Sequence, residues 1–256
     1  MNEHIKLPLD KIAIKRIDKY PNKPTIIFLH DSLGCIELWR DFPEKLGELT
    51  QCNVLIYDRQ GYGESCSFSD SKRDNKYLEL EADILNTLID YWKLKEVLLF
   101  GHSDGGSIAL ILAGKYPNKI KGIVTEGAHI FVEDLTINGI QKVIELYKTT
   151  NLKSKLTKYH GNKTEEMFWA WAATWTTNDY KYWNIEQFIP NIKCPSFIIQ
   201  GENDEYGTLK QVNRIINATK GSSRALILPN IKHSPHKEVP QLVLEKTAYF
   251  IKQLDF

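Results

Sequence analysis

A single serine-bearing turn, Gly101-His102-Ser103-Asp104-Gly105-Gly106, constrains the fold of this chain more than any other stretch. The apolar run 97–100 before it predicts a buried strand, and the apolar run 107–114 after it predicts a buried helix. So sharp a turn strains the backbone of its central residue and tolerates only small neighbours two positions to either side. Because Gly101 and Gly105 occupy those positions, the hydroxyl of Ser103 is expected to project from the tip of the turn.

Apolar runs and helical patterns alternate on both sides of this turn. Strands are predicted at 25–29, 53–57, 97–100, 122–128, 196–201 and 225–228, and helices at 39–49, 78–92, 107–114, 208–217 and 240–254. In the helix 78–92, one face carries Leu80, Ile84, Leu85, Leu88 and Tyr91. Such alternation predicts an α/β fold with parallel strands and right-handed crossovers. The segment 5–20 alternates apolar and charged residues, which predicts an antiparallel hairpin at the start.

The region 131–189 departs from this alternation. It contains no strand-like run, but several helical stretches rich in aromatic residues, including four of the six tryptophans. We therefore expect a core formed by residues 1–130 and 190–256, with residues 131–189 inserted as a helical cap. The tryptophans either build the cap's own core or wall an apolar pocket above Ser103, and the sequence does not separate these two roles.

Four motifs in this order resemble the α/β-hydrolase superfamily, in the branch with a serine nucleophile and a helical lid. Besides the serine turn, residues 58–65 are similar to its D-x-x-G-x-G-x-S segment, and residues 201–204 to its G-x-x-D turn. Residues 232–236 resemble its G-H-S-P-H loop, with Lys232 in place of the usual glycine. The resemblance implies a mostly parallel sheet with an antiparallel N-terminal hairpin, helices on both faces and a helical lid insertion.

The resemblance also assigns a catalytic triad. A serine hydroxyl is a weak nucleophile and needs a base that is itself oriented by a carboxylate. In this family the nucleophile, acid and base follow in that order, each after a strand. The matching residues are Ser103 as nucleophile, Asp204 as acid and His233 as base. Glu126, after an earlier predicted strand, is an alternative acid, whereas Glu205 is expected to face solvent or the lid.

Two backbone amides are expected to form the oxyanion hole. One belongs to Asp104, directly after the nucleophile, and the other to Ser32, at the third position of a loop that reads H-G-x in related hydrolases. Here that loop is His30-Asp31-Ser32. Because a carboxylate would oppose a nearby oxyanion, the side chains of Asp31 and Asp104 are expected to point away and to pair with a cation or with loop amides.

The six other histidines are expected to have structural roles, to line the pocket or to lie at the surface. His30 and His102 follow buried strands and are expected to be packed and hydrogen-bonded. His129 is expected to line the pocket, and His236 to brace the histidine loop. His4 and His160 are expected to be exposed to solvent.

The composition argues against partners recognised by charge. The 33 Lys and Arg residues balance 32 Asp and Glu residues, giving a net charge of +1, so neither nucleic acid nor an anionic membrane would be attracted. The four cysteines show no C-x-x-C spacing, and we recognise no secretory leader, metal motif, P-loop or dinucleotide fingerprint. We expect a cytoplasmic protein without metal or cofactor, whose partner is a small substrate of apolar character. The oligomeric state stays open.

The resemblance implies a serine hydrolase that cleaves a small or medium carboxylic ester, thioester or lactone through an acyl-enzyme. The same triad supports C–C bond hydrolysis, perhydrolysis or acyl transfer in similar folds, so these chemistries stay open. A third possibility, from a different class, is a ligand receptor that keeps the triad and reports ligand binding to a protein partner.

Overall fold

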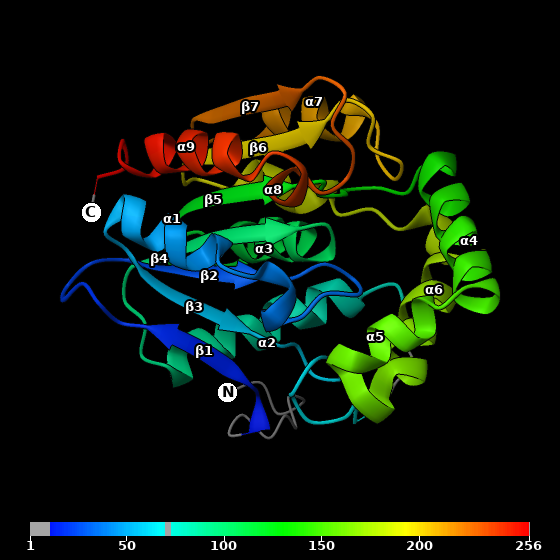
Figure 1. Ribbon diagram of the computed structural model, residues 1–256. Coiled ribbons are helices and arrows are strands. Elements are labelled where there is room, and N and C mark those ends of the chain that lie inside the picture. Colours follow the sequence, from blue (N-terminus) through cyan, green and yellow to red (C-terminus); the bar gives the residue numbers. More distant parts are fainter. Residues whose placement is uncertain (1–10, 70–72, 256) are drawn as a thin grey trace.

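A seven-stranded sheet forms the centre of the computed structural model, which describes residues 11–69 and 73–255 (Figure 1). Its strands are β1 (Ile14–Ile17), β2 (Thr25–Leu29), β3 (Asn53–Tyr57), β4 (Val97–His102), β5 (Ile120–Glu126), β6 (Ser196–Gly201) and β7 (Ser223–Leu228). They lie in the order β1-β3-β2-β4-β5-β6-β7, and within the described residues β1 alone runs antiparallel. The mostly parallel α/β sheet predicted from the sequence is confirmed, including an antiparallel start. The first part of the predicted hairpin, residues 5–10, lies outside the described residues.

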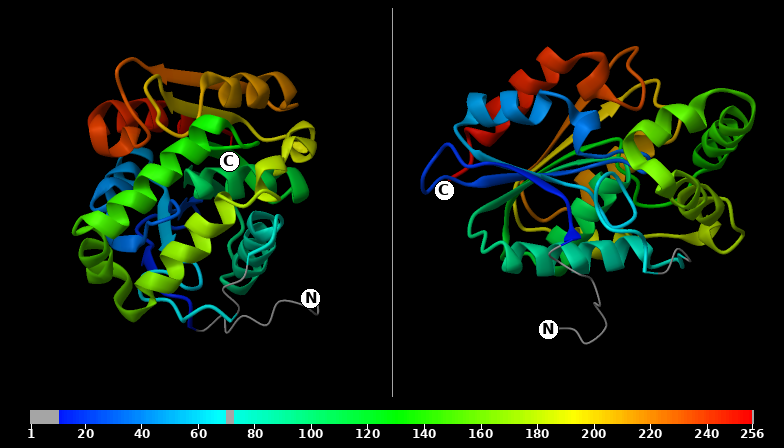
Figure 2. Two further views of the ribbon diagram at one scale, coloured as in Figure 1. Left: turned by 90° about the vertical axis from the view of Figure 1, so that its right-hand side faces the viewer. Right: turned by 60° about the horizontal axis from the view of Figure 1, so that its bottom comes forward.

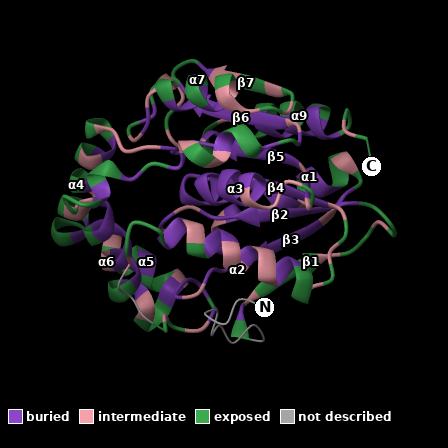
Figure 3. Ribbon diagram, turned by 180° about the vertical axis from the view of Figure 1, so that it is seen from behind, coloured by how far each residue is buried: buried purple, intermediate pink, exposed green. Residues whose placement is uncertain are grey.

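Helices cover both faces of the sheet, as predicted. One face carries α2 (Tyr77–Tyr91), α3 (Asp104–Lys115) and α7 (Leu209–Ala218); the other carries α1 (Phe42–Thr50), the short α8 (Pro235–Glu238) and α9 (Pro240–Ile251). Side chains alternate between the two cores along each strand: Ile27 and Leu55 pack with α2 and α3, whereas Ile26 and Val54 pack with α1 and α9. Figure 3 shows that the inner strands β2 to β6 and the helix α3 are buried almost throughout, whereas the edge strands β1 and β7 are partly exposed. Across the described chain, every helix lacks the length and apolar character needed to cross a membrane.

The buried face of α2 differs from the expected one. Leu80 and Tyr91 are half-exposed, at 50% and 51%, although Leu85 and Leu88 are buried as expected. The helix buries a stripe rotated toward Leu78, Ala82, Leu85 and Ile89. This stripe has the spacing of three and four residues that lets it pack along α3, which is apolar on every side.

The segment 131–189 contains α4 (Asp134–Thr149), α5 (Leu152–His160) and α6 (Thr164–Trp175). These helices lie beyond the carboxyl ends of the parallel strands, and the left view of Figure 2 looks onto them. Tyr147 of α4 stacks on Phe168 of α6, with ring centroids 3.7 Å apart. Aromatic side chains therefore join α4 to α6, and both rings belong to the same apolar core as α2 and α3.

Candidate active site

Ser103 sits between β4 and α3 in a strained backbone conformation, with φ +55° and ψ −119°. Its N–H donates to the carbonyl of Glu126 at 2.8 Å, which ties the turn to the neighbouring β5. A Cβ atom at Gly101 would overlap the carbonyl of Gly105, and one at Gly105 would overlap the carbonyl of Leu29. The two glycines are therefore required by the close approach of backbone to backbone, and the tight turn follows from them.

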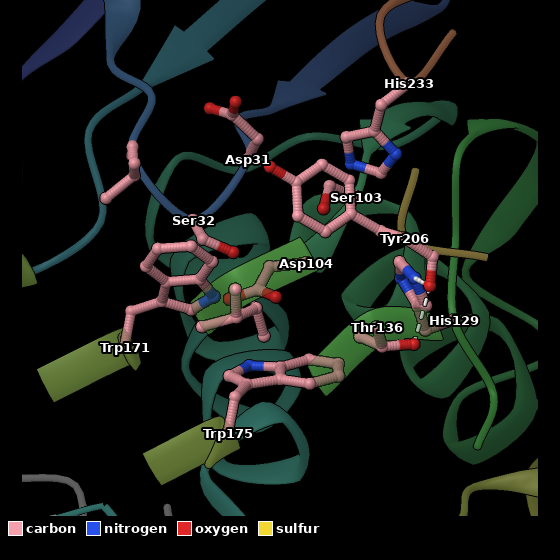
Figure 4. Close-up of a pocket in the computed structure, with 12 residues that line it drawn as sticks. Asp31, Ser32, Ser103, Asp104, His129, Thr136, Trp171, Trp175, Tyr206 and His233 are labelled. Carbon is pink, nitrogen blue, oxygen red and sulfur yellow. Dashed lines mark hydrogen bonds between the residues drawn. The ribbon is translucent and has the colours of Figure 1, made fainter. Parts of the chain in front are cut away.

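A cavity of about 80 Å³ opens beside the Ser103 hydroxyl (Figure 4). His233, Ser32 and the nucleophile turn line it from the sheet side. The helical segment 131–189 contributes Thr136, Ile140, Trp171 and Trp175. All four of Phe168, Trp171, Trp175 and Trp183 pack into the apolar core. Of these, Trp171 and Trp175 also wall the cavity, so both roles left open by the sequence occur.

His233 and Asp204 form a bonded pair at the rim of the cavity. Nδ1 of His233 lies 2.9 Å and 2.8 Å from the two carboxylate oxygens of Asp204. The carboxylate also accepts hydrogen bonds from the amide of Gln200 at 2.7 Å and from the backbone N–H of Tyr206 at 2.8 Å. Asp204 is thus held in place by three donors, which fixes the orientation of the imidazole.

The electrostatics of this pair favour an imidazole that binds a proton readily. Burial lowers the pKa of His233, but the charge and hydrogen bond of Asp204 outweigh burial and raise that pKa above 6.5. Burial raises the pKa of Asp204, and the facing His233 more than offsets it, so the pKa of Asp204 is lowered. In this resting arrangement, none of the hydrogen bonds found for His233 in the described chain reaches the Ser103 hydroxyl. Catalytic bonds of this kind often form only with substrate bound.

Glu126, the alternative acid, is directed elsewhere. Its carboxylate lies 2.6 Å from Nδ1 of His236, and both side chains are buried. His236 therefore connects the histidine loop to β5, in keeping with its expected bracing role. The structure brings Asp204, and not Glu126, to the imidazole of His233.

The two residues expected to supply oxyanion amides both line the cavity. Asp104 is the first residue of α3, so its N–H belongs to the free amides at a helix N-terminus, where negative charge is favoured. Its carboxylate accepts a hydrogen bond from the Tyr77 hydroxyl at 2.9 Å and lies 3.8 Å from the buried Arg59 guanidinium. The hydroxyl of Tyr77 in turn accepts from the indole of Trp175 at 2.7 Å.

Asp31 also lines the cavity, but its carboxylate is directed away from Ser103 (Figure 4). One oxygen lies beside Gly34 and the other lies 3.8 Å from Nδ1 of His102. Burial raises the pKa of Asp31, and the charge of Lys237 together with nearby His102 outweighs it, so this carboxyl is held ionised. Asp31 and Asp104 are thus each engaged by groups outside the cavity.

One histidine prediction is wrong, and the prediction for His4 lies outside the described residues. His160 is buried, because α5 carries it against the loop that follows β3. Its Nδ1 accepts from the N–H of Gly63 at 2.9 Å, and its Nε2 donates to the carbonyl of Leu33 at 3.1 Å. His30 and His102 are buried as predicted, and His129 lines the cavity. In the described ranges, no group of three or more His, Cys, Asp or Glu side chains could hold a metal ion.

Tyr206 and Thr136 were not identified from the sequence. Thr136 of α4 donates to the carbonyl of Tyr206 at 2.5 Å, and His129 bonds to the same carbonyl at 3.1 Å. The Tyr206 ring packs against His233, with centroids 4.6 Å apart. Its position two residues after Asp204 is a signal that could have drawn attention to it.

Gly127 provides a test of how tightly His233 is held. This residue has φ +57°, and a Cβ atom there would lie 2.8 Å from Cε1 and 2.9 Å from Nδ1 of His233. Gly127→Ala is therefore expected to displace the imidazole and to lower kcat/KM by about 100-fold. The matched control is Gly161→Ala, which has φ +58° with no neighbour within 4 Å. Equal activity of both variants would show that the imidazole tolerates the displacement.

The amino-acid sequence and the structure of this chain are similar to those of known hydrolases. Residues 24–150 match the sequence family described as alpha/beta hydrolase fold. A human protein named serine hydrolase BPHL is 29% identical over 222 residues, which cover 82% of this chain and 73% of that protein. An Escherichia coli K12 protein named 2-hydroxy-6-oxononadienedioate/2-hydroxy-6-oxononatrienedioate hydrolase is 22% identical over 225 residues, 77% of each chain. The crystal structure of an enol-lactonase from Burkholderia xenovorans LB400 superposes with a TM-score of 0.74 at 15% identity, covering 94% of this chain and 96% of that one.

Proposed function

Because the chain belongs to the α/β-hydrolase superfamily and is a hydrolase, we propose that it cleaves small carboxylic esters through an acyl-enzyme on Ser103. The observation that carries this proposal is the meeting of three features at one cavity. These are a serine on a strained turn, an imidazole bonded to a buried carboxylate, and the free amides at the start of α3. Together they provide nucleophile, base and oxyanion donors.

In the proposed reaction, Ser103 Oγ attacks the ester carbonyl while Nε2 of His233 takes the hydroxyl proton. Asp204 accepts the hydrogen bond from Nδ1 and stabilises the imidazolium that forms. The amides of Ser32 and Asp104 hold the oxyanion. His233 then protonates the leaving alcohol, and a water molecule, activated by the same imidazole, releases the acid and restores Ser103.

The cavity supports a small acyl group. Its volume of about 80 Å³ is well below that of pockets that enclose drug-sized ligands. We propose that the helical segment 131–189 acts as a cap, since Trp171 and Trp175 close the cavity from that side. The test is a series of p-nitrophenyl esters from acetyl to dodecanoyl. The proposal expects kcat/KM to peak at acetyl to butyryl, and turnover independent of Ser103 would overturn it.

The similarity to the Escherichia coli hydrolase and to the enol-lactonase supports two further substrate classes, C–C bonds beside a ketone and lactones. In this proposal, both would react with the same nucleophile and oxyanion donors as an ester. If the protein reacts with a fluorophosphonate at Ser103 but leaves all p-nitrophenyl esters intact, these substrates replace simple esters in the proposal.

The pH dependence of kcat/KM follows from the raised pKa of His233. The base must be neutral to accept the proton of Ser103, and Asp204 raises the pKa of its imidazole above 6.5. Activity is therefore expected to be full at high pH and to fall as the pH drops through this raised pKa. A kcat/KM profile from pH 5 to 9 checks this, and a midpoint below 6.5 would contradict it.

A further inference from the structure

A second histidine–carboxylate pair lies behind the first. Nδ1 of His236 is 2.6 Å from Oε2 of Glu126, and the two side chains are 3% and 0% exposed. The other oxygen of Glu126, Oε1, is buried without a hydrogen-bond partner in the described part of the chain. The contact with His236 is therefore the side-chain hydrogen bond found for this carboxyl group among the described residues.

This pair connects the nucleophile to the loop of the base. Glu126 ends β5, and its backbone carbonyl accepts the N–H of Ser103 at 2.8 Å. His236 belongs to α8, three residues after His233. A second link runs beside the first, because Nε2 of His102 donates to the backbone carbonyl of His233 at 2.9 Å. Glu126 and His102, which both adjoin Ser103, thus hold the loop of His233 through two hydrogen bonds.

The surroundings keep the His236 ring in one orientation. The rings of Trp39 and Phe42 pack against it, with centroid distances of 4.7 Å and 5.7 Å. Burial raises the pKa of Glu126 and lowers that of His236. With the imidazole uncharged, a single proton lies between Oε2 and Nδ1 whether or not the carboxyl is ionised, so the hydrogen bond persists as the pH changes. The charged or titratable groups around the pair are Lys237 of α8, Asp31 after β2, and His102 and His233.

We propose that Glu126 and His236 are positioning residues, which set the distance between the Ser103 hydroxyl and the His233 imidazole. This inference rests on the proposed function, because it assigns to the pair the alignment of that nucleophile and that base. Neither residue touches the cavity, so the substrate itself is expected to be bound equally well without the pair.

The test compares His236→Ala with His236→Asn. The side-chain amide of asparagine places an N–H close to the position of Nδ1, so His236→Asn keeps the bond to Glu126, whereas His236→Ala removes it. We expect His236→Ala to lower kcat by at least about tenfold with KM within about twofold, and His236→Asn to restore most of kcat. Rates are divided by the concentration of sites that react with a fluorophosphonate, so that unfolded protein does not count.

The pH profile separates positioning from mere stability. When the loop is released, the bond between His233 and Asp204 weakens, and the acid limb of kcat/KM in His236→Ala is expected to move down toward pH 6.5. In His236→Asn the limb stays in place. Unchanged kcat and pH profile in His236→Ala, or equal losses in both variants, would overturn the inference.

Two further results keep the inference separate from folding and from the proposed function. If His236→Ala does not fold, NMR of the wild-type protein decides. We expect a downfield proton resonance from the hydrogen bond between His236 and Glu126 throughout the range from pH 5.5 to 9. The absence of this resonance would overturn the proposed positioning role of the pair. Turnover retained in Ser103→Ala would overturn the proposed function itself. Turnover that depends on Ser103 but not on His236 would overturn only the positioning role.

Discussion

Ser103→Ala is expected to lower the turnover of p-nitrophenyl esters by about 10⁵- to 10⁶-fold, leaving only the rate that binding and the oxyanion donors supply. The substitution removes the single atom that attacks the carbonyl. Folding should be preserved, because alanine keeps a Cβ atom in the same strained backbone conformation and no hydrogen bond of the turn uses the hydroxyl as its donor. Steady-state kinetics and a thermal melt measure both effects.

The matched control is Ser222→Ala, an exposed serine in the loop before β7. It should leave both kcat and the melting temperature unchanged. If Ser103→Ala instead retains the wild-type rate with a wild-type melt, the nucleophile lies elsewhere and the assignment of the active site is wrong.

Asp204→Asn is expected to lower kcat by on the order of 10⁴-fold. The carboxylate accepts the hydrogen bond of Nδ1 and so presents an unprotonated Nε2 to Ser103. An asparagine can donate an N–H to Nδ1 and stabilise the opposite tautomer. The acid limb of the pH profile should also move down, because the charge that raises the pKa of His233 is removed.

Glu205→Gln is the control for this change, since it removes the neighbouring carboxylate. Glu205 is exposed and bonds to the backbone N–H of His233 at 3.3 Å, so its charge is screened by solvent. We expect its kcat to stay within about threefold of the wild type. Similar losses in both variants would indicate that activity depends only on negative charge near His233. That result would contradict the specific role assigned to Asp204.

The strands, the helices and the serine turn could be predicted because their signals are local. Each parallel strand is a short apolar run. The tight turn at Ser103 requires small residues two positions to either side, and Gly101 and Gly105 lie within the same five residues of the sequence. Whether Asp204 or Glu126 faces His233 could not be decided in this way. Glu126 ends β5 and Asp204 follows the neighbouring β6, so both lie at the same edge of the sheet. The choice depends on how the loops after these strands pack against the loop of His233.

The burial of His160 was missed for a similar reason. His160 ends a polar helix, so its sequence context predicts an exposed side chain. Its hydrogen bond with the N–H of Gly63 forms only because α5 packs on the loop after β3. The network from Arg59 through Asp104 and Tyr77 to Trp175 is equally hidden, because its members are separated by up to 116 positions in the sequence. Contacts of this range are set by tertiary packing and leave no periodic pattern.

The central claim is that Ser103 becomes acylated during turnover. The most direct measurement is peptide mass spectrometry of the protein after reaction with a fluorophosphonate and, separately, after rapid acid quenching during turnover of p-nitrophenyl butyrate. The account predicts one adduct, on the peptide that contains Ser103, in the wild-type protein and no adduct in Ser103→Ala. An adduct on another residue, or ester turnover with no acylated Ser103 at any time, would contradict it.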